Sequence, residues 1–424
     1  MFEGKVFPLS VQKYNDGKIF MGKIGNERVL VVEAADNLFD GTIISGNDSS
    51  YKQCPLSHEN AVALRKAFPF TAPVSVLKNK KTIGLGDRLG LAAPGHIKLI
   101  KDNPEYTPIL AQQSMRELNL TGRTYENVLD DVTFAVFQEG YTGGFGSDGD
   151  HLKTAEDIKY ALNCGYTMIT LDCSDHIDND GGTIQNIYGA AIDHAEDIFH
   201  NVIKTCGREV DFELSIDETS FTTSPEAHRY VAEELIKRGV KMATIAPRFC
   251  GEFQKGIDYI GDIAQFEKEF SEHAKIAREL GHKISVHSGS DKFAVFSIIG
   301  KETAGVFHVK TAGTNWLEAV RVIAAKEPSL YRKMHKCALS VLDEAKKYYV
   351  IGARVENIAD IDTLSDEQLP TYLDKDDSRQ VLHITYGLIL DEMRAEIFEV
   401  LNKYENEYAE NLKKHIGKHL ELLG

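Results

Sequence analysis

Three histidines of this 424-residue chain could together bind a metal ion: His151, His287 and His308. Each stands at or beside the C-terminal end of a segment with the pattern of a β-strand. In a parallel barrel such ends meet at one face, so we expect the three imidazoles to converge. Three neutral imidazoles with an open fourth position form a catalytic site for zinc, and manganese, nickel or cobalt could use the same ligands. His176 is a competing ligand, because it follows another predicted strand.

Carboxylates near these histidines could transfer protons. Asp150 directly precedes the first histidine, and Glu252 lies on the exit loop of another predicted strand. Two carboxylates that reach a substrate from different loops could act as acid and base on its opposite faces. Glu139, Asp172 and Glu218 are alternatives, either as partners that orient an imidazole or as metal ligands themselves. Helix capping or a surface ion pair is the simpler interpretation of each one alone.

A cationic turn follows the last predicted strand. Lys310 is succeeded by residues 311–315, which lead into a helix N-terminus whose free N–H groups favour an anion. A substrate carboxylate or phosphate could bind there. A Schiff base on Lys310 is the alternative, although a nearby metal would make it redundant. The other candidates for substrate contacts are polar residues at or beyond strand ends: Arg88, Gln138, Asp172, Glu218, Arg248 and Ser288.

From about residue 82 onward, short apolar runs alternate with helical patterns, which is typical of βα units. Thr154 with Asp157 predicts a helix start, and so does Pro225 after Ser224. The glycine-dense segment 140–151 predicts a loop that could close as a lid. The predicted strands are 82–86, 132–138, 167–172, 210–216, 240–246, 284–287 and 305–310. The predicted helices are 154–164, 191–204, 225–238, 263–280 and 316–325.

The number and order of these units predict an α/β fold, a (β/α)₈ TIM-like barrel. A doubly wound sheet would concentrate its polar residues at one switch point, whereas here nearly every strand end is polar. An eighth strand is expected near residues 383–386. Residues 1–80 predict an N-terminal β-rich cap with a hairpin at Gly25-Asn26, and residues 81–326 the barrel core. Residues 327–424 predict a helical C-terminal extension that could complete the barrel, pack on it or form a homo-oligomer.

The composition excludes several classes of protein. With 42% hydrophobic and 26% charged residues, the chain resembles an ordinary soluble protein. A net charge of −16, from 48 basic and 64 acidic residues, argues against nucleic acid or an anionic membrane as partner. The sequence contains no apolar run long enough for a membrane span, no signal segment and no dinucleotide-binding or phosphate-loop motif, so we expect a cytoplasmic location. Six scattered cysteines predict reduced thiols.

Five stretches together resemble the tagaturonate epimerase family, which interconverts fructuronate and tagaturonate at C4 and includes members acting on fructose and tagatose. They are FAVFQEGYTGGFGSDGDHLKT, TMITLDCSDHI, IAPRFCGEFQKGID, ISVHSGSDKF and FHVKTAGTNW. The resemblance runs from about residue 82 to residue 326. It implies a divalent metal ion held by His151, His287 and His308, with Asp150 and Glu252 as the catalytic pair. The resemblance implies a small ketose or ketohexuronate as partner. Because the sequence offers no strongly basic phosphate clamp beyond Lys310 and the helix start after it, we expect this substrate to carry no phosphate.

The chemistry of such an epimerase is constrained by the position of C4. In a 2-ketose C4 is β to the carbonyl, so its C–H bond is not acidified. Retro-aldol cleavage of the C3–C4 bond is therefore favoured over transient oxidation at C4, which needs a nicotinamide. Arg88, Arg248 or Lys310 would hold a uronate carboxylate. A class II aldolase, an aldose–ketose isomerase and a non-enzymatic sugar-binding protein are the alternatives.

Overall fold

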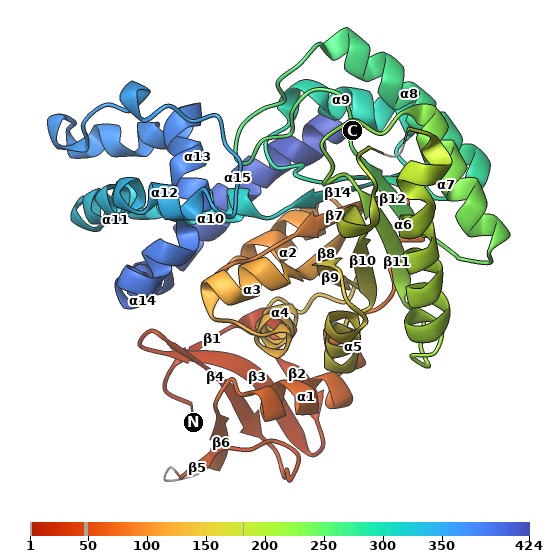
Figure 1. Ribbon diagram of the computed structural model, residues 1–424. Helices are drawn as coiled ribbons and strands as arrows, with labels where there is room; N and C mark the ends of the chain where they lie inside the picture. Colours follow the sequence, from red (N-terminus) through yellow and green to blue (C-terminus); the bar gives the residue numbers. More distant parts are fainter. Residues whose placement is uncertain (1, 46–49, 181) are drawn as a thin grey trace.

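The computed structural model describes residues 2–45, 50–180 and 182–424, and its centre is a closed barrel of parallel strands (Figure 1). Each strand pairs with the next along the chain, and the last pairs with the first, so the predicted (β/α)₈ TIM-like barrel is confirmed. The barrel strands are β7 (Lys81–Leu85), β8 (Tyr106–Ser114), β9 (Gly146–Leu152), β10 (Met168–Asp172), β11 (Asp211–Ile216), β12 (Thr244–Pro247), β13 (Lys283–Val286) and β14 (Phe307–Thr311).

Helices follow each strand and surround the barrel. Their starts obey the predicted capping chemistry: Thr154 Oγ1 accepts from the Asp157 N–H, and Ser224 caps the helix that begins at Pro225. The helices are α2 (Ala93–Asp102), α3 (Met115–Thr121), α4 (Tyr125–Gln138), α5 (Ala155–Cys164), α6 (Ile184–Ile198), α7 (Pro225–Lys237), α8 (Ile263–Leu280), α9 (Phe293–Glu302) and α10 (Gly313–Lys326). Their inward faces and the strands form one large apolar core.

Two predicted strands are wrong. Residues 132–138 belong to α4, which Thr124 opens with a capping box to Asn127. The run reads as a strand because both sides of this helix are buried, Val132 toward the barrel and Phe134 toward the N-terminal sheet. Residues 383–386 span the end of one helix and the start of another. Because all four residues are buried, this run also has the sequence pattern of a strand. The sequence did not reveal two barrel strands: β8, which contains Pro108, and β9.

The segment 140–151 was predicted as a loop, but its second half is strand β9. Gly-Ser-Asp-Gly-Asp-His-Leu lacks the apolar residues of an ordinary strand, because its side chains line a polar interior. Gly149 is required by packing, since a Cβ there would lie 3.0 Å from Leu152 Cδ1 and 3.1 Å from Ala161 Cβ.

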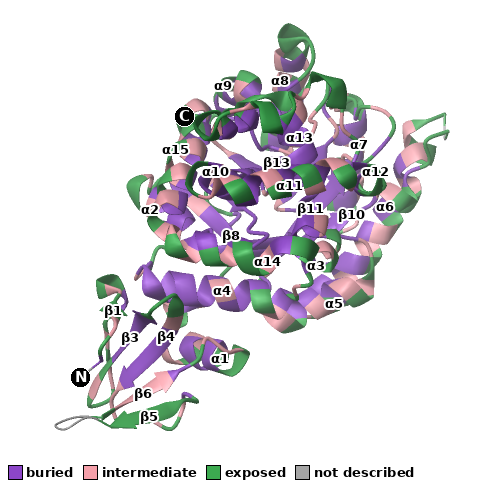
Figure 2. Cartoon of the chain, turned by 90° about the vertical axis from the view of Figure 1, so that its left-hand side faces the viewer, coloured by how far each residue is buried: buried purple, intermediate pink, exposed green. Residues whose placement is uncertain are grey.

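The N-terminal part is a separate six-stranded sheet with one helix, as predicted for a β-rich cap. The hairpin turns at Gly25-Asn26, and Ser57 caps α1. The elements are β1 (Lys5–Val6), β2 (Gln12–Tyr14), β3 (Gly17–Ile24), β4 (Glu27–Glu33), β5 (Thr42–Ser45), β6 (Ser50–Cys54) and α1 (His58–Ala67). The sheet packs on α4. The helix α1 also contacts α4, through an ion pair of 2.9 Å between Arg65 and Asp130. Figure 2 shows the buried residues of β3 and β4 facing that helix.

The C-terminal part is helical, as predicted, and has an apolar core of its own built partly on α10. Its last helix returns to the barrel and packs against α2 and α9, where Tyr106 Oη donates to the Leu420 carbonyl at 2.9 Å. The helices are α11 (Pro328–Ser340), α12 (Leu342–Ala345), α13 (Asp376–Ile384), α14 (Tyr386–Lys403) and α15 (Glu405–Leu423). None of the described helices combines the length and apolar character that crossing a membrane requires. All six cysteines are free thiols.

Candidate active site

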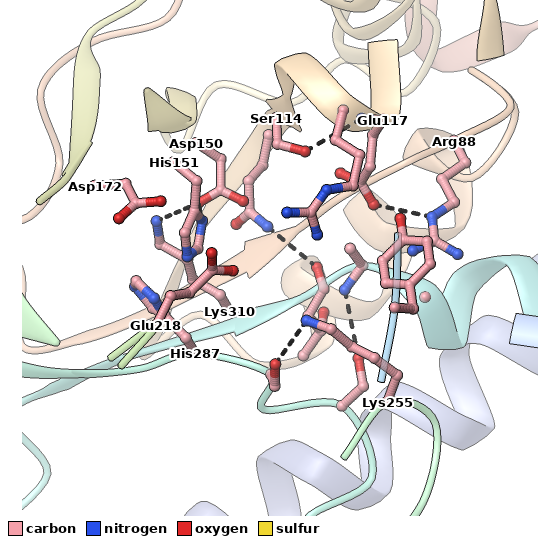
Figure 3. A pocket seen from close by; sticks show the side chains of 18 of the residues that line it. Arg88, Ser114, Glu117, Asp150, His151, Asp172, Glu218, Lys255, His287 and Lys310 are labelled. Atoms are coloured by element: carbon pink, nitrogen blue, oxygen red, sulfur yellow. Dashed lines mark hydrogen bonds and ion pairs between the residues drawn. The ribbon is translucent and has the colours of Figure 1, made fainter. Parts of the chain in front are cut away.

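A polar cavity of about 150 Å³ opens at the C-terminal ends of the barrel strands (Figure 3). This is the face at which the catalytic residues of (β/α)₈ barrels converge. The residues that line it on the strand side include Gln112, Asp150, His151, Asp172, Asp217, Glu218, His287, Ser288 and Lys310. Tyr349 and His383 of the C-terminal part also line it, so the helical extension completes the wall of the cavity.

Asp150 and His151 are consecutive residues, and both line the cavity. Regular strands point consecutive side chains to opposite faces, so the backbone must depart from regular geometry here. It does: His151 has a φ of +53°, and the pairing of β9 with β10 shifts register between Ile169 and Leu171. Such a bulge redirects a side chain, and a non-glycine residue with positive φ is uncommon outside functional sites.

Each of the two cavity histidines that come from barrel strands, His151 and His287, is oriented by a carboxylate behind it. Asp150 Oδ1 lies 2.9 Å from His151 Nδ1, and Glu213 Oε1 lies 2.7 Å from His287 Nε2. When these nitrogens donate, the lone pairs of His151 Nε2 and His287 Nδ1 remain available. Both of these nitrogens lie beside Asp217, at 3.9 Å from Oδ1 and 3.2 Å from Oδ2 respectively.

The three residues His151, Asp217 and His287 thus present one ligand atom each within 4.8 Å of one another. His287 Nδ1 is buried and has no hydrogen-bond partner among the described residues. Two imidazoles and a carboxylate, each imidazole backed by a second carboxylate, are the ligand set of catalytic zinc sites. The residues present therefore fit a divalent metal ion.

The electrostatics of the cluster favour a bound cation. Burial alone would lower the pKa of His287, but Asp217 and Glu213 raise it to about 10. Burial likewise opposes ionisation of Asp217, yet His287 and His151 hold the pKa of this carboxyl below its usual range. The carboxylates that keep a proton on His287 would stabilise a divalent cation in its place, since the cation binds the neutral imidazole.

Lys310 lies beneath this cluster and is fully paired. Its Nζ lies 2.7 Å from Asp148 Oδ2, 2.7 Å from Asp150 Oδ1 and 2.8 Å from Glu213 Oε1. Burial would lower the pKa of Lys310, but these three carboxylates raise it well above the ordinary value, so the side chain stays charged. A lysine neutralised in this way holds carboxylates of the protein, which argues against its predicted role in holding a substrate carboxylate.

Two predicted members of the site do not line this cavity. His308 is the second residue of β14 and lies deeper in the barrel, two residues below Lys310 on the same inward face. Its Nδ1 lies 3.0 Å from Thr82 Oγ1, and burial lowers its pKa to about 3. Glu252 is exposed, because its loop folds back in backbone hydrogen bonds with Ile260 and turns the carboxylate toward Gln254.

The predicted substrate contacts divide similarly. Arg88, Asp172, Glu218 and Ser288 line the cavity, as predicted. Gln138 is instead at the end of α4, where its Oε1 accepts from Arg28 at 3.1 Å. Three further predicted residues also lie elsewhere: Arg248, whose backbone N–H bonds Thr223, Glu139 at the end of α4, and His176, whose ring stacks on His194.

Several functional candidates were missed in the sequence. Asp217 directly follows β11, as a ligand at a strand end should, and this position could have identified it. Glu213 sits in mid-strand, where only the structure shows that it contacts His287. Arg116, Lys255 and His383 come from loops and helices whose approach to the cavity leaves no pattern in the sequence.

The closed barrel and the polar cluster at its C-terminal face define an enzyme of the (β/α)₈-barrel class. The family model for tagaturonate epimerase matches residues 7–186 and 182–423. The tagaturonate/fructuronate epimerase of Thermotoga maritima is 38% identical over 468 residues, which cover 99% of this chain and 97% of the relative. The chain therefore belongs to the tagaturonate epimerase family, and it is an epimerase, hence an isomerase.

Solved structures agree over the whole chain. The native crystal structure of fructuronate-tagaturonate epimerase UxaE from Cohnella laeviribosi has a TM-score of 0.96 at 46% identity and covers 100% of this chain and 97% of its own. A crystal structure of the same enzyme with one glycerol bound has a TM-score of 0.96 at 45% identity, with the same coverage.

Proposed function

We propose that the protein interconverts tagaturonate and fructuronate at C4 in a reaction that depends on a divalent metal ion. Membership of the family supports the substrates, and the cluster of His151, Asp217 and His287 supports the metal dependence. That cluster is the observation on which the proposal mainly rests. Zinc fits the ligand set best, and manganese, nickel or cobalt could occupy it.

The ion would be held by His151, Asp217 and His287. When bound, it supplies Lewis-acid stabilisation of the negative charge that develops on the oxygens of C2 and C3. Glu213 and Asp150 keep the two imidazoles in the tautomers that such binding requires. Lys310 holds Asp150 in place and keeps the buried charges balanced.

Retro-aldol cleavage and re-addition account for inversion at C4. A carboxylate takes the proton of the C4 hydroxyl, the C3–C4 electron pair moves into the C1–C3 fragment, and C4 becomes an aldehyde. The aldehyde fragment, which bears the carboxylate of the hexuronate, turns its other face to C3. The C3–C4 bond then re-forms, and the C4 oxygen regains a proton.

Asp150 and Glu218 are the carboxylates that we assign to this proton transfer. Both line the cavity, and they come from different strands, the first from β9 and the second from the exit of β11 (Figure 3). Glu218 is exposed to the cavity and has no ion-pair partner among the described residues. Glu218 thus takes the place that we predicted for Glu252.

Product analysis tests the reaction. Metal-loaded protein incubated with tagaturonate should form fructuronate, and the mixture should reach the same ratio from fructuronate. Accumulation of three-carbon fragments would instead indicate an aldolase, and lack of any conversion would contradict the proposal. Tagaturonate deuterated at C4 tests the mechanism, because retro-aldol cleavage leaves the C4–H bond intact and transient oxidation would give a primary isotope effect.

A further inference from the structure

The cations of the cavity are not equivalent. Lys310 is neutralised by three carboxylates, and Arg88 pairs with Glu117 at 2.9 Å. Lys153 pairs with Asp175 at 2.8 Å. The cavity cations that form no ion pair with a described carboxylate are Arg116 and Lys255. These two therefore retain positive charge that a ligand could use.

Lys255 is held in position without being neutralised. It belongs to the loop that follows β12, and its Nζ donates to Ser288 Oγ at 2.7 Å. Ser288 directly follows the metal-ligand candidate His287 and has a φ of +49°, an uncommon backbone conformation for a residue other than glycine. A lysine carries three N–H donors, and a single bond to a hydroxyl leaves donors for a ligand.

The N-terminus of α10 lines the same cavity as Lys255. This 14-residue helix has Ala312 at its N-cap, which offers no side-chain cap. The amides of Gly313 and Thr314 have no hydrogen-bond partner among residues 2–45, 50–180 and 182–424. Uncapped N–H groups at a helix start favour an anion.

His383 supplies an independent sign of a missing ligand. The residue is 2% exposed, and its Nδ1 has no hydrogen-bond partner within the described chain. Nε2 lies 3.5 Å from the Arg88 guanidinium and must accept there, so Nδ1 is the protonated nitrogen. Gly313 leaves room for this ring, since a Cβ at that position would lie 1.8 Å from His383 Cε1.

We propose that Lys255, His383 and the first amides of α10, with Arg116 at the margin, form the subsite that binds the substrate's carboxylate. This inference rests on the proposed function and adds to it the position of the hexuronate. Figure 3 places Lys255 across the cavity from Asp172 and His151. The end of the cavity near Asp172 is acidic and would repel the carboxylate of the substrate, whereas the end near Lys255 is positive. The subsite would retain the aldehyde fragment while it turns.

The test compares K255M with K255R and with a matched surface variant, K275M, on the exposed side of α8. Loss of one charge-assisted hydrogen bond should raise the KM of K255M for tagaturonate by about 10- to 100-fold. K255R should recover most of the affinity, and K275M should behave as wild type. Zinc content and the melting temperature of each variant show that the metal centre and fold are intact.

The outcomes separate the two proposals. A wild-type enzyme that does not convert tagaturonate contradicts the proposed function. A wild-type enzyme that converts it, together with a K255M variant whose KM stays within about twofold of wild type, overturns the carboxylate subsite alone. A K255R variant as impaired as K255M would also overturn it, because the loss would then reflect packing and not charge.

Discussion

Glu213 Oε1 lies 2.7 Å from His287 Nε2, and both side chains are buried. When a metal ion takes the place of the second proton of His287, this bond keeps the remaining proton on Nε2, so that Nδ1, which lies 3.2 Å from Asp217 Oδ2, would be free to bind the ion. Glu213 also contacts Lys310 and is thus part of the ion-pair cluster below the cavity. One mid-strand carboxylate therefore connects the buried charges of the barrel to the candidate metal ligands.

The first prediction concerns this bond. In E213Q the imidazole of His287 loses the carboxylate that orients it, so the affinity for zinc should fall by about 10- to 100-fold. Competition with a chromophoric chelator measures this affinity. E218Q is the matched control, because Glu218 lines the cavity outside the ligand group, and it should bind zinc as wild type does. Equal affinities in all three proteins would contradict the role assigned to Glu213.

The second prediction concerns Lys310. Replacing it in K310M leaves Asp148, Asp150 and Glu213 buried without a cation, which should lower the free energy of unfolding by about 3–5 kcal/mol. Urea unfolding measures the change. K153M removes a partly exposed ion pair at the cavity margin and should cost only about 0–1 kcal/mol. If K310M proved as stable as K153M, the charge-balancing role would be wrong.

The third prediction tests the close approach of α10 to His383. A Cβ in G313A would overlap the His383 ring, so the substitution should destabilise the protein by about 1–3 kcal/mol and raise the KM for substrate. G189A offers the opposite case: Gly189 lies within α6 with open space around it, and alanine there should stabilise the helix by about 0.5–1 kcal/mol. Thermal melts measure the stability of both variants, and kinetics measure the KM. A G313A protein with the stability and KM of wild type would contradict the close approach of α10 to His383.

The fourth prediction concerns pH and a buried histidine chain outside the active site. His228 Nδ1 lies 3.0 Å from His273 Nδ1, and His228 Nε2 lies 2.9 Å from His282 Nε2. Burial holds the pKa of His228 well below its usual value and lowers the pKa values of His273 and His282 to about 4. Histidines in the unfolded chain have a pKa of about 6.5. Between about pH 6.5 and about pH 4 the unfolded chain therefore takes up protons that the folded chain does not.

Stability should therefore be lost as the pH falls below about 6.5, by up to about 1.4 kcal/mol per pH unit for each histidine. Urea unfolding of wild type at several pH values between neutrality and about pH 5 measures the slope. H273Q should show a shallower slope, and H176Q, which changes an exposed histidine, should keep the wild-type slope. Identical slopes in all three would contradict the neutral, buried chain.

Much of the fold could be predicted from the sequence, because most barrel strands are apolar runs and most of the helices around the barrel, α3 to α8, begin at a residue whose side chain caps them. The secondary-structure predictions that failed have one physical cause: the buried residues do not follow the periodicity that is expected for a helix or a strand with one buried face. Residues 132–137 are apolar on two sides of a helix and imitate a strand, whereas β9 is polar because its side chains line the cavity. Local sequence does not distinguish these cases, since the partner surface decides which residues are buried.

The candidate site shows the same limit. His151, His287 and Asp150 follow from their positions at strand ends, and the structure brings them together. His308 and Lys310 lie two residues apart on the same inward face of β14, and of the two only Lys310 lines the cavity. The strand pattern alone does not show which of the two positions reaches the cavity. Glu252 does not line the cavity, because its loop folds back on itself through the pairing of Glu252 with Ile260, and its side chain is exposed.

The most direct test of the central claim is a titration of metal-free protein with zinc while tagaturonate epimerisation is measured. We predict that activity rises from near zero and saturates at one ion per chain, and that a protein with both H151A and H287A neither binds zinc at this site nor gains activity. Full activity of the metal-free wild type, or an equal response of the double variant to zinc, would contradict the assignment of His151, Asp217 and His287 as the metal centre of this epimerase.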